Sequence, residues 1–290
     1  MSYTLGIDGG ATATKWALRK ADGTFIEGNS GPIDGHIYRS ESKERLEKVL
    51  KEIKITSGSE IVTSIYAGLT GLGKEGEAEV MQLIKKEFPQ ARVELALDIV
   101  LGYRANFDLG AGIFLYAGTG SIAIHISKSG EVIRSGGWGY LLGDEGAGYW
   151  IGREAIRESV KSLDMKVQLE ALDREILKSI GANNWDEVKA FVYSNDRSAI
   201  AALSSTVVSL AKTGDTKSIK ILQTAGIHLS ELVERIELVI GNTGLPVVIG
   251  GGIAGASPLL VETIGAKLNR SVVVSNVRIA NRAAELAAIS

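Results

Sequence analysis

A short apolar stretch near the N-terminus ends in an acidic residue followed by glycines and threonines, Asp8-Gly9-Gly10-Ala11-Thr12. Glycine lets backbone N–H groups approach an anion closely, and threonine hydroxyls add donors, so this pattern could hold a phosphate. Asp8 would repel phosphate oxygens unless a divalent cation lay between them, which suggests Mg²⁺ together with a nucleotide. A tight hairpin turn with an incidental aspartate would have the same composition.

A second Gly/Thr turn, Ala117-Gly118-Thr119-Gly120-Ser121, also follows an apolar stretch. Each of the two turns is followed at a similar interval by a hairpin glycine, Gly23 after the first and Gly130 after the second. This agreement predicts a duplicated unit with a phosphate hairpin in each copy. Thr119 and Gly120 would then offer a hydroxyl and an N–H group to the outer phosphates of a nucleotide, whereas a simple hairpin turn is the alternative.

The glycine triplet Gly250-Gly251-Gly252 comes after an apolar stretch and before a predicted helix. Bare backbone at these positions would let an adenine or its ribose lie flat against the chain, but a tight strand-to-helix turn needs the same residues. The spacing differs from the dinucleotide fingerprint, and the chain has no Gly-Lys-Ser/Thr motif. The pattern therefore disfavours Rossmann and P-loop nucleotide sites.

Asp98 ends a predicted strand and begins a predicted helix. Ligands of α/β proteins collect at this carboxyl edge of the sheet. An aspartate there could take the proton from an attacking hydroxyl and orient that hydroxyl toward a γ-phosphate. The alternative is a helix N-cap, a role that aspartate fills well and that is compatible with catalysis.

Trp138 lies in a glycine-rich stretch shortly before Asp144 and Glu145. A tryptophan in such a loop could stack on the apolar face of a sugar, while the two carboxylates accept hydrogen bonds from the hydroxyls of the sugar. The alternative is a core tryptophan followed by the acidic start of a helix, where negative charge is favourable.

The composition is that of an ordinary globular protein: 290 residues, 45% apolar, 23% charged and a net charge of −2. The absence of a basic stripe argues against a nucleic-acid partner. No apolar run reaches about 18 residues and the start lacks a signal-peptide profile, so we expect no membrane association and a cytoplasmic location. The chain has no cysteine, which excludes disulfides, Cys-ligated zinc, iron–sulfur clusters and Cys nucleophiles.

Strands and helices alternate in a pattern that repeats, which predicts an α/β protein of two similar domains. The predicted domains are residues 1–110 and residues 111–278, with a plausible hinge at 108–112 and a helical insertion in the second domain. Among the predicted helices are 99–107, 199–212, 216–238 and 258–268.

Five motifs of this chain occur in the order found in one family: Gly6-Ile7-Asp8-Gly9-Gly10, 117–121, Gly137-Trp138-Gly139, Gly143-Asp144-Glu145-Gly146 and 250–252. The set resembles the N-acetylglucosamine kinase-like sugar kinases, in the BadF/BadG/BcrA/BcrD ATPase-type branch of the sugar kinase, heat-shock chaperone and actin superfamily. The motifs span essentially the whole chain. The two motifs at 137–139 and 143–146 are the most specific for the family.

The resemblance implies two ribonuclease-H-like domains of the actin-like ATPase fold around an interdomain cleft that closes on sugar binding. It also implies that the C-terminal helix, 279–290, returns to the first domain. Asp98 would be the catalytic base, and Asp8 would position Mg²⁺. The residues predicted to bind ATP are Asp8, Gly9, Gly10, Thr12, Gly118, Thr119, Gly120, Gly214, Gly251 and Gly252. The residues predicted to bind the sugar are Asp34, Gly35, Ser121, Gly137, Trp138, Gly139 and Asp144.

Four positions depart from the family pattern and bear on the identity of the sugar. Asp34 stands where asparagine is common, and Ile122 stands where animal N-acetylglucosamine kinases have a polar residue. Ala11 replaces a common glycine, and Ile99-Val100 follows Asp98 where small residues are usual.

The predicted function is an ATP-dependent kinase acting on the 6-hydroxyl of a hexose or amino sugar. N-acetylglucosamine or glucosamine is the first expected acceptor, and glucose is the next. A cysteine-free regulatory ATPase of the same superfamily, without a sugar substrate, is the alternative. The expected partner is a small-molecule sugar, and a homodimer is considered because dimers are common in such kinases.

Overall fold

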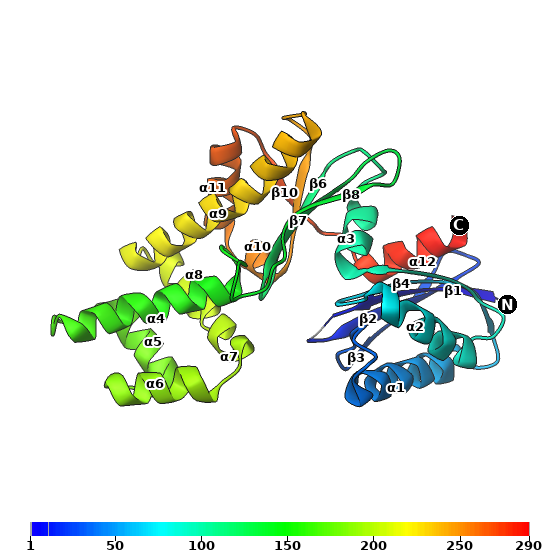
Figure 1. Cartoon of the computed structure of the whole chain (residues 1–290), viewed down its shortest axis with the longest axis horizontal. Coiled ribbons are helices and arrows are strands. Elements are labelled where there is room, and N and C mark those ends of the chain that lie inside the picture. The colour runs from blue at the N-terminus through cyan, green and yellow to red at the C-terminus, as the bar shows by residue number, and fades with distance from the viewer. Residues whose placement is uncertain (1, 11, 290) are drawn as a thin grey trace. The chain divides into compact units, whose positions relative to one another are not determined.

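The computed structural model describes residues 2–10 and 12–289, so the sequence departure at Ala11 lies outside the described residues. The chain divides into two compact units. The first is Met1–Phe107 with Asn276–Ser290, and the second is Asp108–Ser275. Each unit is an α/β structure with a five-stranded mixed sheet, and Figure 1 labels the elements of both.

The sheet of the first unit has the strand order β3-β2-β1-β4-β5. Strands β3, β2 and β1 form an antiparallel meander, and β4 and β5 continue parallel to β1. The strands are β1 (Ser2–Gly9), β2 (Thr14–Lys20), β3 (Phe25–Ser30), β4 (Ile61–Leu69) and β5 (Arg92–Leu97). The helices are α1 (Ser40–Ser57), α2 (Lys74–Glu87), α3 (Asp98–Asn106) and α12 (Ile279–Ile289).

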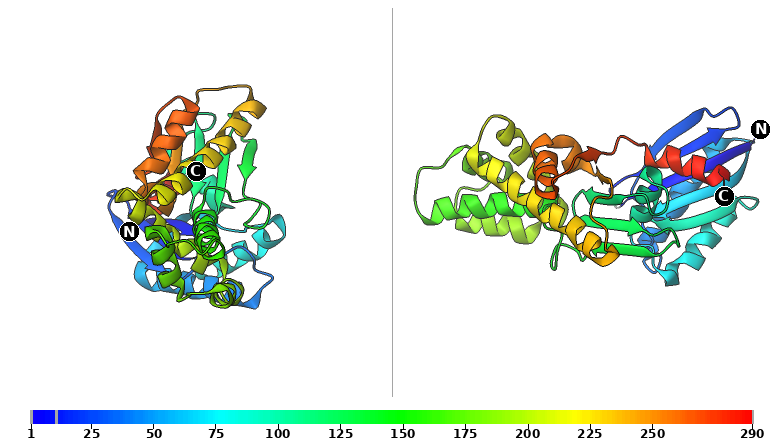
Figure 2. Two further views of the ribbon diagram at one scale, coloured as in Figure 1. Left: turned by 90° about the vertical axis from the view of Figure 1, so that its left-hand side faces the viewer. Right: turned by 90° about the horizontal axis from the view of Figure 1, so that it is seen from above.

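Helices cover both faces of this sheet (Figure 1). Leu46, Leu50 and Ile53 recur at helical spacing along α1, are buried, and pack into the same core as the apolar side of α2. On the opposite face α12 packs against β1, as the view from above in Figure 2 also shows. Gly6 permits this close approach, because a Cβ atom there would lie 2.0 Å from the Ala280 carbonyl oxygen.

The second unit repeats the same sheet plan, with the order β10-β9-β6-β7-β8. Strands β6, β7 and β8 form the antiparallel meander, and β9 and β10 run parallel to β6. The strands are β6 (Ile113–Ala117), β7 (Ser121–Ile126), β8 (Val132–Gly136), β9 (Val247–Gly250) and β10 (Val272–Val274). The helices are α4 (Gly148–Asp164), α5 (Ala171–Ile180), α6 (Trp185–Ser194), α7 (Arg197–Ala202), α8 (Ser204–Lys212), α9 (Thr216–Ile240), α10 (Gly252–Ala256) and α11 (Pro258–Leu268).

The helix predicted over 199–212 is interrupted only at Leu203, which keeps helical φ and ψ angles and divides the segment into α7 and α8. The break coincides with a close helix crossing. Gly152 of α4 lies against α7, and a Cβ atom at Gly152 would be 2.0 Å from the Ile200 carbonyl oxygen. The amphipathic pattern of 199–212 could not predict this contact, because the close approach depends on Gly152, a residue of a different helix.

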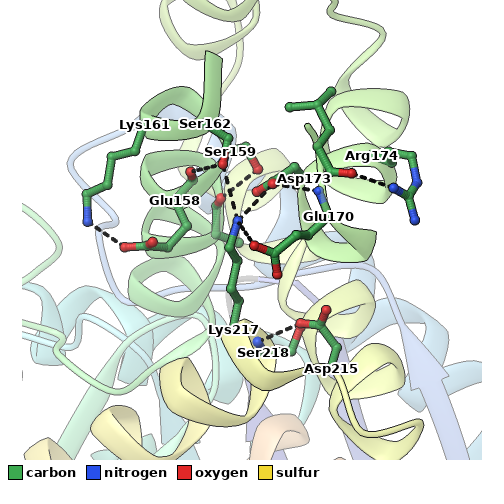
Figure 3. A network of polar contacts seen from close by, with 12 residues as sticks. Glu158, Ser159, Lys161, Ser162, Glu170, Asp173, Arg174, Asp215, Lys217 and Ser218 are labelled. Carbon is green, nitrogen blue, oxygen red and sulfur yellow. Dashed lines mark hydrogen bonds and ion pairs between the residues drawn. The ribbon is translucent and has the colours of Figure 1, made fainter. Parts of the chain in front are cut away.

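A lysine joins three helices of the second unit (Figure 3). Lys217 of α9 places Nζ 2.8 Å from Asp173 Oδ2 of α5 and 3.2 Å from Ser162 Oγ of α4. Burial alone would lower the pKa of Lys217, but the Asp173 and Glu170 carboxylates raise it above its ordinary value. The ammonium therefore stays charged and ties the helical insertion to the long helix α9.

In the described residues, no helix is both long and apolar enough to cross a lipid bilayer.

Candidate functional site

In the first unit, two carboxylates gather at the carboxyl ends of parallel strands. Asp8 is the penultimate residue of β1, and Asp98 begins α3 directly after β5. Strand β4, between β1 and β5, ends just before Thr70, whose N–H donates to the Gly9 carbonyl at 2.9 Å. This edge is where ligands of α/β sheets bind, because the helices start there and leave the edge open.

The electrostatics of the two carboxyls differ. Burial, followed by the negative charge of Asp98, raises the pKa of Asp8 to about 6, while Lys15 acts to lower it. Lys15 stands directly opposite Asp8 in the β1–β2 register. Burial also raises the pKa of Asp98, although hydrogen bonds from the Ile99 N–H and the Thr70 hydroxyl favour its ionised form.

The loop after β3 reaches the same edge through Gly35. Its N–H donates to the Thr70 carbonyl at 2.8 Å, and a Cβ atom at Gly35 would lie 2.4 Å from Leu72 Cα. Both carboxylate oxygens of Asp34 have partners within the loop and α1: the His36 N–H at 2.9 Å and the Ser42 hydroxyl at 3.1 Å. Asp34 therefore shapes the loop, and any contact to a substrate would use its remaining lone pairs.

In the second unit, the turn between β6 and β7 caps helix α4. The carbonyls of Gly118 and Thr119 accept the N–H groups of Gly148 and Tyr149 at 2.8 and 3.1 Å. Two of the donors that a helix start leaves unpaired are satisfied in this way. The geometry fixes the turn 117–121 relative to the acidic loop that leads into α4.

The acidic loop is attached to this turn by Asp144. Its Oδ1 accepts the Ser121 N–H at 3.2 Å, and the Ser121 hydroxyl donates to the Glu145 carbonyl at 2.9 Å. Gly120 leaves room for the carboxylate, because a Cβ atom there would lie 2.6 Å from Asp144 Oδ2. Asp144 has a φ of 64°, a strained conformation for a non-glycine residue and one that is often found at functional sites. Burial raises its pKa.

Trp138 is 65% exposed, so the alternative of a core tryptophan is wrong. The Arg134 guanidinium carbon lies 5.1 Å from the centre of its ring, a cation–π geometry. The flanking Gly137 and Gly139 have φ values of 71° and 83°, which favour glycine and form the loop that presents the indole. The buried tryptophan of this unit is Trp150 in α4.

The glycine triplet meets the turn 117–121. Gly251 has a φ of 101°, and a Cβ atom there would lie 2.1 Å from the Ala117 carbonyl oxygen. Gly252 starts α10 and faces open space. Gly214 lies in an exposed turn between α8 and α9, with a φ of 90°. The structure thus brings 250–252 to the turn, whereas Gly214 and Thr12 are both exposed.

A hollow of about 320 Å³ lies between α4 and α9, lined in part by Trp150, Glu154 and Lys217. None of the residues predicted to bind ATP or sugar lines it.

The BadF/BadG/BcrA/BcrD ATPase family profile matches residues 5–286, nearly the whole chain. The chain belongs to this ATPase family. An N-acetylmuramic acid/N-acetylglucosamine kinase of Clostridium acetobutylicum is 28% identical over 265 residues, covering 87% of this chain and 86% of that protein.

Solved structures agree with this assignment to the BadF/BadG/BcrA/BcrD ATPase family. A candidate N-acetylglucosamine kinase from Chromobacterium violaceum superposes with a TM-score of 0.77 at 25% identity, covering 98% of each chain. A ROK-family glucokinase from Streptomyces griseus, at 12% identity, has a TM-score of 0.62 and covers 99% of this chain and 100% of its own. The glucokinase likeness establishes the fold: each unit has the ribonuclease-H-like sheet of the actin-like ATPases.

Membership of the BadF/BadG/BcrA/BcrD ATPase family implies the use of ATP, and the residues at the end of β1 fit a magnesium nucleotide. Among the described residues, no three His, Cys, Asp or Glu side chains group as a metal site. Mg²⁺ does not need such a group, since it is usually held by one or two carboxylates with waters and phosphate oxygens. Asp8, with its raised pKa and a second carboxylate nearby, is a site where a cation would relieve repulsion.

The structure adds two residues to the candidate site that the sequence analysis did not single out. Thr70 donates its N–H to the Gly9 carbonyl at 2.9 Å and favours the ionised form of Asp98, whose pKa burial raises, and Arg134 stacks on Trp138. A signal for Thr70 was present in the glycine-rich stretch Gly68-Leu69-Thr70-Gly71 after a predicted strand. Arg134 carried no signal, because nothing in a sequence tells which arginine lies over which ring.

Proposed function

We propose that this protein is an ATP-dependent sugar kinase that phosphorylates the 6-hydroxyl of an amino sugar or hexose, with N-acetylglucosamine or glucosamine as the preferred acceptor. The observation that carries the proposal is the pair Asp8 and Asp98 at one sheet edge. A phosphoryl-transfer site needs a group to orient the attacking hydroxyl and a group to anchor the metal nucleotide, and these two carboxyls can divide those roles.

Asp98 is the proposed general base. A hydrogen bond from the Ile99 N–H, at 2.8 Å, orients the carboxylate and favours its ionised form. It accepts the proton of the sugar hydroxyl as that oxygen attacks phosphorus, and general bases of this kind contribute on the order of 10²–10⁴ in rate. Mg²⁺ bound beside Asp8 would neutralise charge on the phosphates.

The sugar is proposed to contact the second unit through Trp138 and Asp144. The exposed indole offers a flat apolar surface, while the Asp144 carboxylate is oriented by the Ser121 N–H and the Ser121 hydroxyl by the Glu145 carbonyl. The Clostridium acetobutylicum relative acts on two acetamido sugars, as its name states, and this favours an acetamido sugar here.

The proposal is tested by a coupled ADP-release assay with Mg-ATP and, in turn, N-acetylglucosamine, glucosamine, glucose, mannose or no sugar. We expect release that depends on one sugar and is reduced by a factor of about 10² or more in Asp98→Ala, with ATP binding retained. Release that is equal with every sugar and without sugar would instead favour a regulatory ATPase. Full activity of Asp98→Ala would refute the base.

A further inference from the structure

We propose that Arg134 is a positioning residue of the sugar site, whose guanidinium holds the Trp138 indole as a fixed platform with one face open to the sugar. The inference rests on the proposed function, because Arg134 acts through the indole that the proposal assigns to the sugar. All the contacts that carry it lie within the second unit.

The indole of Trp138 is exposed, and its loop restrains it only at its base. The Gly137 N–H donates to the Ser121 carbonyl at 2.9 Å, and a Cβ atom at Gly137 would lie 2.7 Å from Ile122 Cδ1. A Cβ atom at Gly143 would lie 3.5 Å from Trp138 Cβ, so the side chain starts beside the acidic loop. These contacts fix the backbone and Cβ of Trp138, whereas the ring itself can still rotate about its side-chain torsions.

Arg134 supplies a contact to the ring itself. It is an exposed residue of β8, the edge strand of its sheet, and the chain turns after it through Gly136 and Gly137, whose φ values are 79° and 71°. The guanidinium carbon lies over the indole, 5.1 Å from the ring centre. Because the attraction of a cation is strongest over the face of a ring, this contact favours one ring orientation. It occupies one face and leaves the other to a sugar.

No acidic side chain competes with the indole for this guanidinium in the part of the chain that the structure describes. Arg134 forms no ion pair or hydrogen bond there. Other arginines of the second unit are paired: Arg157 lies 3.0 Å from Glu154, and Arg270 lies 2.6 Å from Glu237. The charge of Arg134 is therefore directed to the ring rather than neutralised by a carboxylate.

A restrained indole affects binding of the sugar more than the chemical step. A ring that is already ordered loses less conformational entropy when a sugar stacks on it, so the restraint increases affinity. Proton transfer is assigned to Asp98, which Arg134 does not contact. Loss of the guanidinium should therefore raise the sugar KM and leave kcat nearly unchanged.

The experiment measures sugar KM and kcat by ADP release at saturating Mg-ATP in the wild type, Arg134→Gln, Trp138→Ala and the double variant. We expect Arg134→Gln to raise the sugar KM about two- to fivefold, the effect of losing an exposed cation–π contact, with kcat within about twofold. In the Trp138→Ala background the same change should raise KM no further, because the ring through which Arg134 acts is gone. Arg134→Lys keeps a cation and should recover part of the affinity.

The matched control is Lys189→Gln in α6. Lys189 Nζ lies 4.1 Å from the ring centre of Trp185, which is 63% exposed, so the two form a second exposed cation–π pair of the same unit. Neither residue is among those predicted to bind the sugar. Lys189→Gln removes the same charge as Arg134→Gln and should leave the sugar KM unchanged.

Several results would overturn the inference. An unchanged sugar KM in Arg134→Gln would show that the guanidinium is dispensable, and an equal rise with and without Trp138 would show that it acts independently of the indole. An equal rise in Lys189→Gln would reveal a general effect of charge. If Arg134→Gln does not fold, Arg134→Met decides, because it keeps an aliphatic stem and also lacks the charge. A wild type without sugar-dependent release would refute the proposed function itself, whereas the other results leave that function standing.

Discussion

Asp98, at the start of α3, lies close enough to Asp8, at the end of β1, for its negative charge to raise the pKa of Asp8. Burial is the larger cause, and together they raise that pKa to about 6, while Lys15 opposes them. At neutral pH, ionisation of Asp8 is therefore opposed by burial and by repulsion from Asp98. A cation bound beside Asp8 would offset this unfavourable free energy.

The first prediction concerns the pH dependence of stability in metal-free protein. The pKa of Asp8 is raised in the folded state, so its contribution is fully present below about pH 4, the pKa of an unfolded aspartate, and is lost as pH rises to about 6. Asp8→Asn removes this titration. We expect the Tm of Asp8→Asn to exceed that of the wild type above pH 6 and the difference to shrink toward pH 4.

The control for this titration is Asp22→Asn, because Asp22 is exposed and its pKa is lowered by its hydrogen bonds to Thr24. That variant should show no gain in Tm above pH 6. A Tm difference between Asp8→Asn and wild type that is constant from pH 4 to 7 would contradict the assignment. Thermal unfolding followed by circular dichroism in EDTA is the measurement.

The second prediction contrasts Trp138 with Trp150, both in the second unit. Trp138 is 65% exposed, so Trp138→Ala should leave Tm nearly unchanged while raising the sugar KM about fivefold, the effect of losing about 1 kcal/mol of aromatic stacking. Trp150 is 7% exposed and meets His228 edge-on, so Trp150→Ala should lower stability by about 3–5 kcal/mol. Steady-state kinetics and thermal unfolding check the pair. An unchanged sugar KM in Trp138→Ala would remove the indole from the sugar site.

The third prediction concerns the contact between the glycine triplet and the turn 117–121. Gly251→Ala would place a methyl group against the Ala117 carbonyl at a φ of 101°, so we expect a loss of about 3 kcal/mol or more. Gly255 in α10 faces open space, and Gly255→Ala should be neutral or stabilising by about 0.5–1 kcal/mol. Urea unfolding of both variants tests this, and equal stabilities would show that the close approach is absent.

The fourth prediction concerns the buried ion pair of Lys217 with Asp173, whose side chain is fully buried (Figure 3). Asp173→Ala should cost about 1–3 kcal/mol, because it removes the buried partner of Lys217 and the acceptor of the Glu170 N–H, while Glu170 remains 3.4 Å from the lysine. Glu175→Ala breaks an exposed pair with Lys178 and should cost less than about 1 kcal/mol. Urea unfolding should also show that Asp173→Ala with Lys217→Ala costs less than the sum of the single changes. Strict additivity would mean that the two side chains do not interact.

The sequence predicted local elements where one face is regularly apolar. The helix predicted over 216–238 is confirmed as α9 (Thr216–Ile240), whose Leu222, Leu229 and Ile236 are buried. The two Gly/Thr turns and the hairpin glycines predicted two copies of one plan, and the two sheets have matching strand orders. These predictions succeeded because periodicity and turn chemistry are properties of neighbours in the chain.

Other features depend on contacts between distant residues. The break at Leu203 follows a close crossing at Gly152, and the exposure of Trp138 depends on positive φ angles at the glycines beside it. A tryptophan among glycines fits either a core or a loop, and only the folded chain decides between them. The same holds for Arg134, which gains its position over the ring from β8.

By itself, the sequence determined which residues can do chemistry: the aspartates at strand ends, the glycines of the turns and the family motifs that join them. Tertiary structure decided which of them meet. It set Asp98 near Asp8, joined Thr70 to the end of β1 through the Gly9 carbonyl and joined the Asp144 carboxylate to the Ser121 N–H. The physical reason is that burial and charge at a site are set by segments far apart in the chain, whose approach depends on how the sheet and helices pack.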